Sequence, residues 1–267
     1  MNAAPETAGS QDDTALPLVA ITGAGGRVGG LSIEALAGRY RLRLIDLDWP
    51  DGSDDVAVPS AERVACDLRD PDACVAAVDS VDMLVHLAAQ PSPQIGVRVA
   101  IEDVAMPTAN LVAAAGSSKM GRMVFASSIH TMGLYDRADT VPIRSEWPTR
   151  PCCEYGTAKV FSENLLRLLT ERSNISVICL RLGLTGALPT TPHAVSQWLG
   201  SDDYAHLLRR SLTAEVVYGT YFGVSAPATS RWDLSTAEAD LGYRALEVPP
   251  PPEEPDPDAP SGNCLMG

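Results

Sequence analysis

Tyr155 and Lys159 lie four residues apart, a spacing that puts both side chains on one face of a helix, one turn apart. A neighbouring ammonium group stabilises a phenolate, so we expect Lys159 to lower the pKa of the Tyr155 phenol from about 10 towards neutral pH. A phenol with such a pKa can exchange a proton with a hydroxyl or carbonyl group. Taken alone, the same spacing is also common on solvated helix faces.

A pair of serines ends an apolar run over residues 122–128. A strand that ends in two serines delivers a hydroxyl group at the carboxyl edge of a parallel sheet, where crevices for ligands form. We therefore expect Ser128 to hold a reacting oxygen beside Tyr155, and Ser128, Tyr155 and Lys159 are the candidate catalytic residues. His130 extends the same polar edge, although a single histidine after a strand is as often a structural hydrogen-bonding group.

Three glycines follow the first apolar run, Gly23, Gly26 and Gly29, and a helical pattern begins directly after them. Glycine permits a tight turn and a close approach of the backbone to a pyrophosphate, and the start of a helix offers N–H groups and a favourable dipole. The pattern predicts a dinucleotide-binding loop formed by Gly23, Gly26, Arg27, Val28 and Gly29. A flexible glycine turn without a ligand is the alternative that this motif alone leaves open.

Acidic residues follow the second and third apolar runs, at Asp46 and Asp67. Asp46 lies 23 residues beyond Gly23, where a carboxylate accepts a hydrogen bond from the ribose 2′-hydroxyl of NAD and repels the 2′-phosphate of NADP. Asp67 could accept a hydrogen bond from the adenine amino group. We therefore expect NAD as the cofactor, with NADP less favoured, and Arg27 in the loop is the one feature that leaves the use of both cofactors open.

Short apolar runs alternate with longer helical patterns along the chain. The runs cover residues 18–22, 41–46, 63–66, 83–86, 122–126 and 177–181. Helical patterns begin near Gly29, Asp72, Ile101, Tyr155 and Ser201. This alternation is typical of a parallel sheet with helices on both faces, so we expect an α/β fold with a six-stranded, doubly wound Rossmann sheet and a small C-terminal substrate-binding appendage.

The chain of 267 residues divides by composition into four parts. We expect a disordered extension over residues 1–16, an NAD-binding domain over 17–182, a substrate-binding segment over 183–247 and a disordered tail rich in proline and acidic residues over 248–267. One face of the helical pattern over 155–172 carries Val160, Phe161, Leu165, Leu168 and Leu169. That face could pack in the protein's own core or against a partner subunit in a homo-oligomer.

The net charge of −14 disfavours nucleic acid and anionic membrane surfaces as partners, so we expect a small-molecule substrate. The N-terminus lacks the basic and apolar regions of a secretion signal, and no apolar run approaches the length of about 18 residues that a membrane helix needs, so we expect a cytoplasmic protein. The six cysteines include no C-x-x-C pair and no Cys/His metal spacing. We expect neither disulfides nor a metal, and interpret Cys152 and Cys153 as two loop thiols.

The combination of these motifs resembles the extended short-chain dehydrogenase/reductase superfamily, whose pattern is a G-x-x-G-x-x-G loop, an Asp after the second strand, a Ser before Y-x-x-x-K, and NAD. The likeness covers most of residues 18–182. It implies an NAD-dependent dehydrogenase or reductase in which Tyr155 acts as general base or acid. It also implies cofactor contacts from Leu68, Leu87, Ala88, Ala89, Tyr155, Lys159 and Leu182.

Several segments are similar to uronate dehydrogenases and haloarchaeal sugar dehydrogenases, namely residues 125–133, 154–159 and 198–204. The chain departs from that pattern where those families have a substrate-facing Asn, a Ser and an Arg, which are here Ile129, Leu184 and His193. Each lost partner in a buried pocket costs about 1–3 kcal/mol, so we expect a less polar or differently shaped substrate than a uronate. Its expected contacts are Gln90, Ile129, His130, Leu184 and His193.

These observations favour an NAD-dependent oxidoreductase that transfers a hydride between NAD and a secondary alcohol or hemiacetal carbon of a small sugar-like or cyclic substrate. One alternative is a nucleotide-sugar epimerase or dehydratase that retains its NAD, although only about 65 residues between the sixth run and the tail remain for a nucleotide-binding lobe. Another is an NAD-binding regulator without catalysis. It is favoured by the replacement of the superfamily's lysine-supporting Asn, here by Asp103 or Val104.

Overall fold

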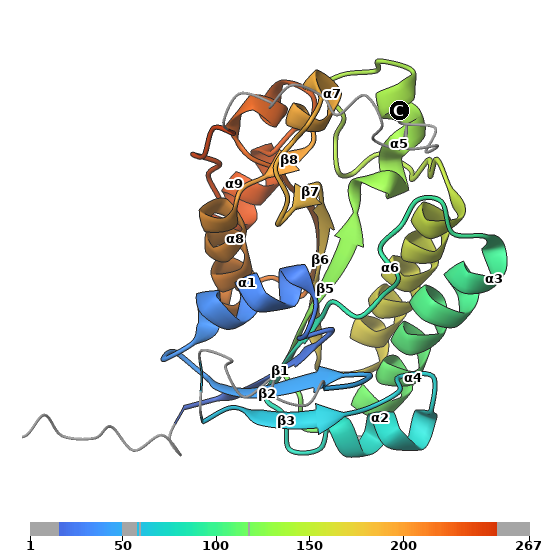
Figure 1. The fold of residues 1–267 in the computed structure, drawn as a ribbon, viewed down its shortest axis with the longest axis vertical. Coiled ribbons are helices and arrows are strands. Elements are labelled where there is room, and N and C mark those ends of the chain that lie inside the picture. The colour runs from blue at the N-terminus through green and yellow to red at the C-terminus, as the bar shows by residue number, and fades with distance from the viewer. Residues whose placement is uncertain (1–15, 50–57, 59, 117, 250–267) are drawn as a thin grey trace, which may run out of the picture.

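The computed structural model describes residues 16–49, 58, 60–116 and 118–249, and most of the predicted disordered ends, 1–16 and 248–267, lie outside this part. The strands of its central sheet are β1 (Leu18–Thr22), β2 (Arg41–Asp46), β3 (Glu62–Ala65), β4 (Met83–His86), β5 (Arg122–Ser128), β6 (Ser176–Leu182) and β9 (Tyr218–Gly223). They lie in the order β3-β2-β1-β4-β5-β6-β9, and every neighbouring pair is parallel (Figure 1). The predicted doubly wound sheet is confirmed. Its order reverses between β1 and β4, where ligands bind in such sheets.

Helices cover both faces of this sheet, as Figure 1 shows. One face carries α1 (Arg27–Leu36) and α8 (Ser201–Thr213), and the other carries α2 (Pro71–Ala77), α4 (Met106–Ala115) and α6 (Glu154–Arg172). Successive residues of β1 alternate between the two cores, with Ile21 on the α1 side and Ala20 on the α6 side. Within the described residues, no helix combines the length and the apolar character that a membrane span requires.

The chain beyond β6 contributes to the main sheet as well as to a cap above it. The seventh strand, β9, was not predicted; it pairs with β6, and α8 packs against α1. Its sequence YGTYFG contains Gly219 and Gly223. Glycine is depleted in strands, so the sequence alone does not indicate a strand here. The predicted substrate-binding segment over 183–247 therefore completes the sheet of the cofactor-binding part.

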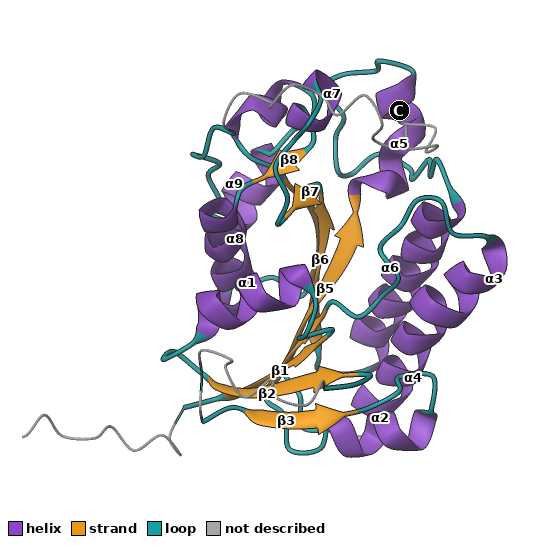
Figure 2. Cartoon of the chain, in the orientation of Figure 1, coloured by secondary structure: helices purple, strands orange, loops and turns teal. Residues whose placement is uncertain are grey.

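The remaining short elements gather at the carboxyl end of the sheet, in the upper part of Figure 2. They are η4 (Ile129–Met132), α5 (Gly133–Arg137), β7 (Leu184–Thr185), α7 (Pro192–Val195), β8 (Trp198–Leu199), η5 (Ala226–Ser230) and α9 (Ser235–Leu241). A third apolar cluster joins them, centred on the fully buried Trp232. Two further elements, α3 (Val97–Ala100) and the π-helical η3 (Ile101–Ala105), lie beside α6.

The buried face of α6 differs from the apolar face that the sequence suggests. Of the five apolar residues of that face only Leu169 is buried, while Phe161 is 51% exposed and Leu168 is 39% exposed. The face that packs on the sheet carries Lys159 and Glu163 instead. Glu163 can be buried there because its carboxylate forms an ion pair of 2.8 Å with Arg181 of β6, also buried.

Candidate active site

The glycine loop joins β1 to α1 and packs tightly against the segment after β4. Gly23 has a φ of +70°, and a Cβ there would lie 2.8 Å from the backbone nitrogen of Ala88. A Cβ at Gly29 would lie 2.4 Å from the carbonyl oxygen of Gly23. Gly26 at the start of α1 has no side chain that could cap the helix, and the first turn holds no acidic residue. The N–H groups in the first turn of α1 therefore have no side-chain cap and can bind an anion, which fits a dinucleotide pyrophosphate.

Asp46 ends β2 directly beside this loop. One carboxylate oxygen accepts a hydrogen bond of 2.8 Å from Gly25 N, and the other accepts one of 2.7 Å from Leu47 N. Arg27 is exposed, and its aliphatic stem lies across Gly186, where a Cβ would come within 2.7 Å of Arg27 Cγ. Arg27 thus connects the glycine loop to the C-terminal segment after β7.

Asp67 and Leu68 follow β3 at the same edge of the sheet. Arg69 donates hydrogen bonds of 2.8–3.1 Å from its guanidinium group to the Asp67 carboxylate and holds the pKa of that carboxyl below its usual range. Arg69 also lies 3.5 Å from Asp103 of η3. Leu68 is buried, and its carbonyl oxygen accepts from the Asn110 side chain. The carboxylate expected to meet adenine therefore already has an arginine partner.

Ser128 and Tyr155 lie side by side at the carboxyl edge of the sheet. Ser128 ends β5, Tyr155 lies in the first turn of α6, and Ser128 is close enough to lower the pKa of the phenol. Both residues are buried. The Ser128 hydroxyl also accepts a hydrogen bond of 3.2 Å from His130 N, which fixes the start of η4. The predicted neighbourhood of this serine and this phenol is present in the structure.

Lys159 lies one turn further along α6, with its Nζ 5.6 Å from the centre of the Tyr155 ring. Nζ donates a hydrogen bond of 2.6 Å to the carbonyl oxygen of Ala126 in β5. Burial lowers the pKa of Lys159 to about 7, although the nearby Glu163 carboxylate opposes this shift. The lysine is therefore held by the strand that ends in Ser128.

The expected lowering of the Tyr155 pKa is wrong for this structure. Burial raises the pKa of the Tyr155 phenol above its ordinary value, and the neighbouring Cys153 raises it further, while the hydrogen bond from Ser128 lowers it. The charge of Lys159 can be inferred from the sequence, whereas the loss of solvent around Tyr155 and Lys159 arises only on folding. Since Lys159 itself has a pKa near 7, it carries a full positive charge only below neutral pH.

A buried histidine that the sequence argument assigned no role supports this edge. His86 ends β4; its Nδ1 lies 2.8 Å from the Thr22 hydroxyl, and its Nε2 lies 3.1 Å from the Thr108 hydroxyl. The Ser162 hydroxyl of α6 donates a hydrogen bond to the Thr108 hydroxyl, so this chain of side chains links β1 to α6. Burial, aided by Lys159, lowers the pKa of His86 to about 3, so the ring is neutral. In the sequence, the available signal for His86 was its position at the end of the apolar run over 83–86, directly before Leu87.

The expected substrate contacts divide into two groups, of which the first follows β5. The rings of His130 and Tyr155 meet edge to face, with their centres 5.9 Å apart. Ile129 points elsewhere, because its side chain is buried in the apolar cluster around Trp232. His130 thus lies beside the phenol, while Ile129 offers little surface to a substrate.

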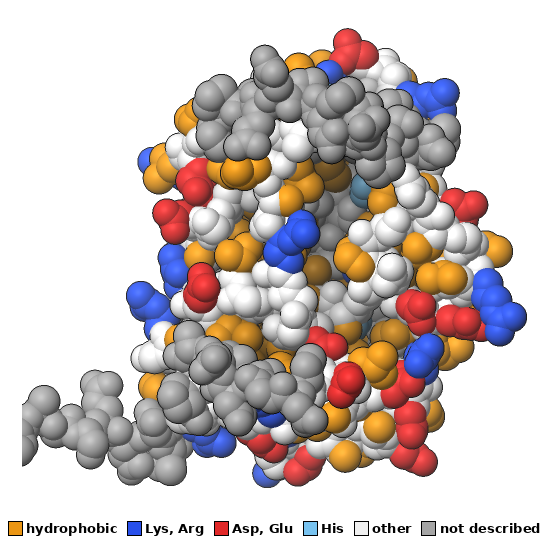
Figure 3. Space-filling model, in the orientation of Figure 1, with side chains coloured by type: hydrophobic (Ala, Val, Ile, Leu, Met, Phe, Trp, Pro, Cys, Tyr) orange, Lys and Arg blue, Asp and Glu red, His pale blue; other side chains and the backbone are white. Residues whose placement is uncertain are grey.

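The second group lies on separate loops. Gln90 is exposed after β4, and Leu184 is half-buried in β7. His193 of α7 is exposed, with its Nε2 3.6 Å from the carboxylate of Asp136. Asp136 is buried and forms an ion pair of 2.8 Å with Arg231. Figure 3 shows this side of the molecule, which is hollowed between the region of α1 and that of α6.

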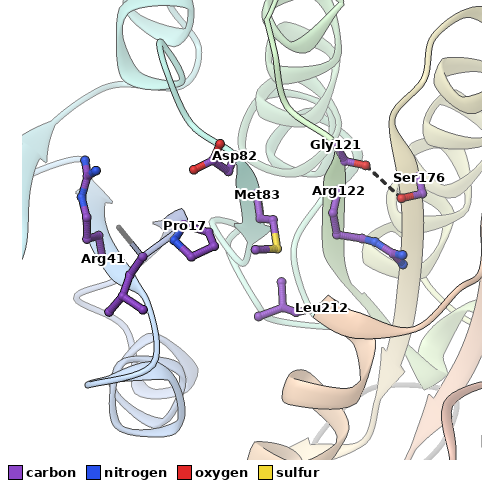
Figure 4. Close-up of a pocket in the computed structure, with 9 residues that line it drawn as sticks. Pro17, Arg41, Asp82, Met83, Gly121, Arg122, Ser176 and Leu212 are labelled. Carbon is purple, nitrogen blue, oxygen red and sulfur yellow. Dashed lines mark hydrogen bonds between the residues drawn. The ribbon is translucent and has the colours of Figure 1, made fainter. Parts of the chain in front are cut away.

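A pocket at the opposite edge of the sheet lies far from these residues along the strands. Its lining lies at the amino ends of the strands and at the end of α8 and includes the residues labelled in Figure 4: Pro17, Arg41, Asp82, Met83, Gly121, Arg122, Ser176 and Leu212. Ser176 donates a hydrogen bond of 2.9 Å to the carbonyl oxygen of Gly121 there. Parallel strands point this edge away from Ser128, so the pocket is not part of the candidate active site.

Comparison with known proteins agrees with this geometry. Residues 19–214 match the model of the NAD dependent epimerase/dehydratase family. The chain is 30% identical over 240 residues to an NAD-dependent glucose-6-phosphate dehydrogenase of Haloferax volcanii, covering 84% of this chain and 91% of that protein. It is 30% identical over 253 residues to a uronate dehydrogenase of Pseudomonas putida, covering 89% and 90%.

Solved structures show the same likeness over nearly the whole chain. A glucuronic acid dehydrogenase from Chromohalobacter salexigens has a TM-score of 0.81 at 29% identity, covering 94% of this chain and 96% of that one. A uronate dehydrogenase mutant from Agrobacterium tumefaciens, complexed with NAD, has a TM-score of 0.79 at 30% identity, covering 95% and 96%. These relatives bear out the predicted likeness to uronate and haloarchaeal sugar dehydrogenases.

The family match runs through the glycine loop, Ser128, Tyr155 and Lys159 without interruption. The predicted superfamily is thereby confirmed, and so is NAD as the cofactor, which the family description names. The prediction of an NAD-dependent dehydrogenase agrees with the relatives and with the cradle that Gly23 and Gly29 form. A glycine-lined turn on a parallel sheet, next to a buried serine, phenol and lysine, thus places this chain in the NAD-dependent epimerase/dehydratase family.

Proposed function

We propose that the protein is an NAD-dependent dehydrogenase that oxidises a secondary alcohol or hemiacetal carbon of a small sugar-like or cyclic substrate. The observation that carries the proposal is the position of Ser128 and Tyr155, both buried, at the carboxyl edge of the sheet. Lys159 lies on the same face of α6, and the glycine loop opens onto the same edge. A ligand held by that loop has its reactive end directed towards the phenol.

The residues have separate tasks in the reaction. NAD, when bound, supplies the nicotinamide carbon that accepts the hydride. Ser128 orients the substrate oxygen by a hydrogen bond, and Tyr155 takes the hydroxyl proton as the carbon–oxygen double bond forms. Before this transfer Tyr155 is a phenolate, which Lys159 in its charged form stabilises, and after it Tyr155 is a neutral phenol. The same residues return the proton when the reaction runs towards the alcohol.

The proposed cofactor contacts come from the glycine loop and the start of α1, from the ends of β2, β3, β4 and β6, and from α6. They are Gly23, Gly26, Arg27, Val28, Gly29, Asp46, Asp67, Leu68, Leu87, Ala88, Ala89, Tyr155, Lys159 and Leu182. Asp46 favours NAD over NADP, because its carboxylate lies against Gly25 of the loop, where a 2′-phosphate would be repelled. NAD rather than NADP is the cofactor that this charge predicts.

The proposed substrate is a sugar-like molecule that needs fewer polar partners than a uronate. Gln90, His130, Leu184 and His193 would surround it, and Ile129 would contribute shape rather than hydrogen bonds. The uronate and glucose-6-phosphate dehydrogenases among the relatives act on sugars that carry an anionic group. The nearest candidate partner for such a group is His193, whose ring lies 3.6 Å from the buried Asp136 carboxylate. That carboxylate disfavours an anion, so we place a neutral sugar first.

The two other functions are less well supported. A nucleotide-sugar epimerase needs a substrate lobe, but α8 and β9 take up much of the chain after β6 to complete the sheet. A regulator without catalysis would tolerate the loss of the lysine-supporting Asn. In this chain, however, Lys159 donates a hydrogen bond to the Ala126 carbonyl oxygen, which holds the lysine in place without that Asn. Asp103 forms an ion pair with Arg69.

A direct assay tests the proposal. Purified protein is incubated with NAD and a panel of aldoses, uronates, sugar phosphates and cyclic alcohols, and NADH is followed by its absorbance. We expect turnover with at least one neutral sugar and turnover at least about 10²-fold lower with the Tyr155→Phe variant. Undiminished turnover in Tyr155→Phe overturns the mechanism, and NAD that stays bound through purification with no NADH formed favours the epimerase.

We also propose a cytoplasmic homo-oligomer. Phe161 and Leu168 are exposed on the outer face of α6, and a second copy of the chain would bury them. Sedimentation of wild type and of a Phe161→Glu variant tests this assembly, which the variant should weaken.

A further inference from the structure

Three side chains beside the candidate phenol combine into a group that metal ions bind. His130 Nδ1 lies 3.3 Å from Cys152 Sγ and 3.7 Å from Cys153 Sγ. The three atoms all lie within 4.8 Å of one another. Among the described residues, no other set of three histidine, cysteine or acidic side chains comes this close together. An imidazole and two thiols are ligands that zinc and related ions prefer over oxygen donors.

The distances suit a tetrahedral ion without rearrangement. Zinc bonds of about 2.0 Å to nitrogen and 2.3 Å to sulfur separate a nitrogen and a sulfur ligand by about 3.5 Å at the tetrahedral angle. The two nitrogen-to-sulfur distances here, 3.3 and 3.7 Å, bracket that separation. Hydrogen bonds from the thiols to the imidazole hold the group in this arrangement before an ion arrives.

The backbone fixes the group from two sides. Cys152 N donates a hydrogen bond of 3.2 Å to the carbonyl oxygen of His130, which ties the chain before α6 to η4. Gly156 allows this approach, because a Cβ there would lie 2.5 Å from the same carbonyl oxygen. The contacts that bring Tyr155 to Ser128 therefore also bring the two thiols to His130.

The charge balance favours a divalent ion over the bare thiols. Cys153 is the N-cap of α6, and its Sγ accepts a hydrogen bond of 3.4 Å from Gly156 N, so negative charge on this sulfur faces the positive end of the helix. Cys152 is buried, and a thiolate there needs a cation to offset the loss of water. Cys153 is only half-buried and gives an ion a way in.

We propose that His130, Cys152 and Cys153 bind a zinc-class divalent ion, with water or a substrate oxygen as the fourth ligand, and that the bound ion inhibits the dehydrogenase. Binding forms one metal–nitrogen and two metal–sulfur bonds and releases two thiol protons to solvent. The His130 ring packs against Tyr155, so the ion is bound by a residue that directly contacts the phenol. The inhibition rests on the proposed function, whereas the binding does not.

Cobalt spectroscopy tests the binding independently of any substrate. The reduced, metal-free protein is titrated with Co²⁺, which takes zinc sites of this kind and shows intense thiolate-to-cobalt absorption and tetrahedral visible bands. We expect about one Co²⁺ per chain, displaced by Zn²⁺. The Cys153→Ser variant should bind Co²⁺ about 100-fold more weakly, and His130→Ala should lose the bands.

The matched control is Cys264→Ser, which removes a cysteine outside the described residues and should keep the bands. Absence of the bands in reduced wild type, or an unchanged affinity for Co²⁺ in Cys153→Ser, overturns the proposal. A count of thiols before the titration identifies a Cys152–Cys153 disulfide; if reduction does not restore cobalt binding, the proposal is also overturned.

An activity arm separates the metal site from the enzyme reaction. Zn²⁺ should inhibit NADH formation by wild type and by Cys264→Ser at concentrations about tenfold or more below those that inhibit Cys153→Ser. Cobalt bands without turnover on any substrate would leave the metal site standing and refute the dehydrogenase. Turnover that saturating Zn²⁺ does not reduce would refute the inhibition.

Discussion

At the carboxyl edge of the sheet the polar side chains are buried, whereas at the amino edge they lie nearer the surface. His86, Ser128 and Lys159 are buried at the first edge. At the second, Asp82 accepts a hydrogen bond of 2.7 Å from Leu18 N, and Ser176 donates to a carbonyl oxygen. Parallel strands supply polar residues at both ends, so sequence position alone does not separate an active edge from an inert one.

The difference lies in desolvation. At the carboxyl edge, burial moves the pKa of His86 to about 3 and that of Lys159 to about 7 and raises that of Tyr155. Of these three groups, Lys159 is the one whose protonation changes near neutral pH. The pocket in Figure 4 is lined by charged groups that include the exposed Arg41 and Asp82, which water solvates. Four sets of variants test whether this contrast holds.

The largest effect is expected from the phenol itself. Tyr155→Phe should lower kcat/KM by about 10²–10⁴-fold, because general acid–base catalysis is lost while the ring still fills its place. Asp82→Asn at the amino edge should change kcat/KM less than about twofold, since it lies outside the reaction centre. Steady-state rates of both variants measure the contrast, and equal losses in the two would remove it.

The second effect concerns buried and exposed ion pairs. Glu163→Gln should lower the free energy of unfolding by about 3–5 kcal/mol, because Arg181 would remain buried without its counter-charge. Glu62→Gln breaks the ion pair between Glu62 and Arg43. The Glu62 side chain is 54% exposed, so this change should lower the free energy of unfolding by only about 0–1 kcal/mol. Urea unfolding monitored by tryptophan fluorescence compares them. A cost for Glu163→Gln below that of Glu62→Gln would contradict the role of burial.

The third effect is the acid sensitivity caused by His86. A histidine in the unfolded chain has a pKa of about 6.5, while the folded value is about 3, so the unfolded state binds more protons between these pH values. The free energy of unfolding therefore falls as the pH drops through this window. His86→Gln should reduce the slope by up to about 1.4 kcal/mol per pH unit. An unchanged slope in urea unfolding at pH 4 to 6 would mean that His86 does not titrate as described.

The smallest effect is a shift in cofactor preference. Asp46→Asn removes the charge beside Gly25 and should raise the ratio of kcat/KM for NADP to that for NAD about tenfold. Asp67→Asn is the control, because Arg69 already offsets that charge and the ratio should move far less. The ratios are measured with one substrate. A larger shift in Asp67→Asn would assign the cofactor charge to the wrong carboxylate.

Local motifs were predicted well where neighbouring residues alone decide them. Gly23 and Gly29 are required by their own backbone turn, and Asp46 follows from the end of an apolar run, so spacing along the chain suffices to find all three. Six of the seven sheet strands lie within two residues of the predicted runs. The seventh, β9, was missed because it interrupts its apolar residues with Gly219 and ends in Gly223.

Other features depend on partners far away in the chain. The sequence left open whether the apolar face of α6 packs in the core, and the structure buries another face, on which Glu163 finds its counter-ion on β6. The Tyr155 pKa was wrong because desolvation outweighs a nearby lysine. The thiols of Cys152 and Cys153 were interpreted as loop thiols because His130 lies more than 20 residues away in the sequence.

The order of amino acids thus determined by itself where the strands of the cofactor half lie, where the glycine turn sits and which side chains could exchange a proton. Those features need only short-range sterics and periodicity. The tertiary structure alone decided which groups lose water, which charges meet and which thiols face an imidazole, because burial and long-range contact exist only after the layers pack. The protonation of His86, Lys159 and Tyr155 therefore belongs to the folded chain.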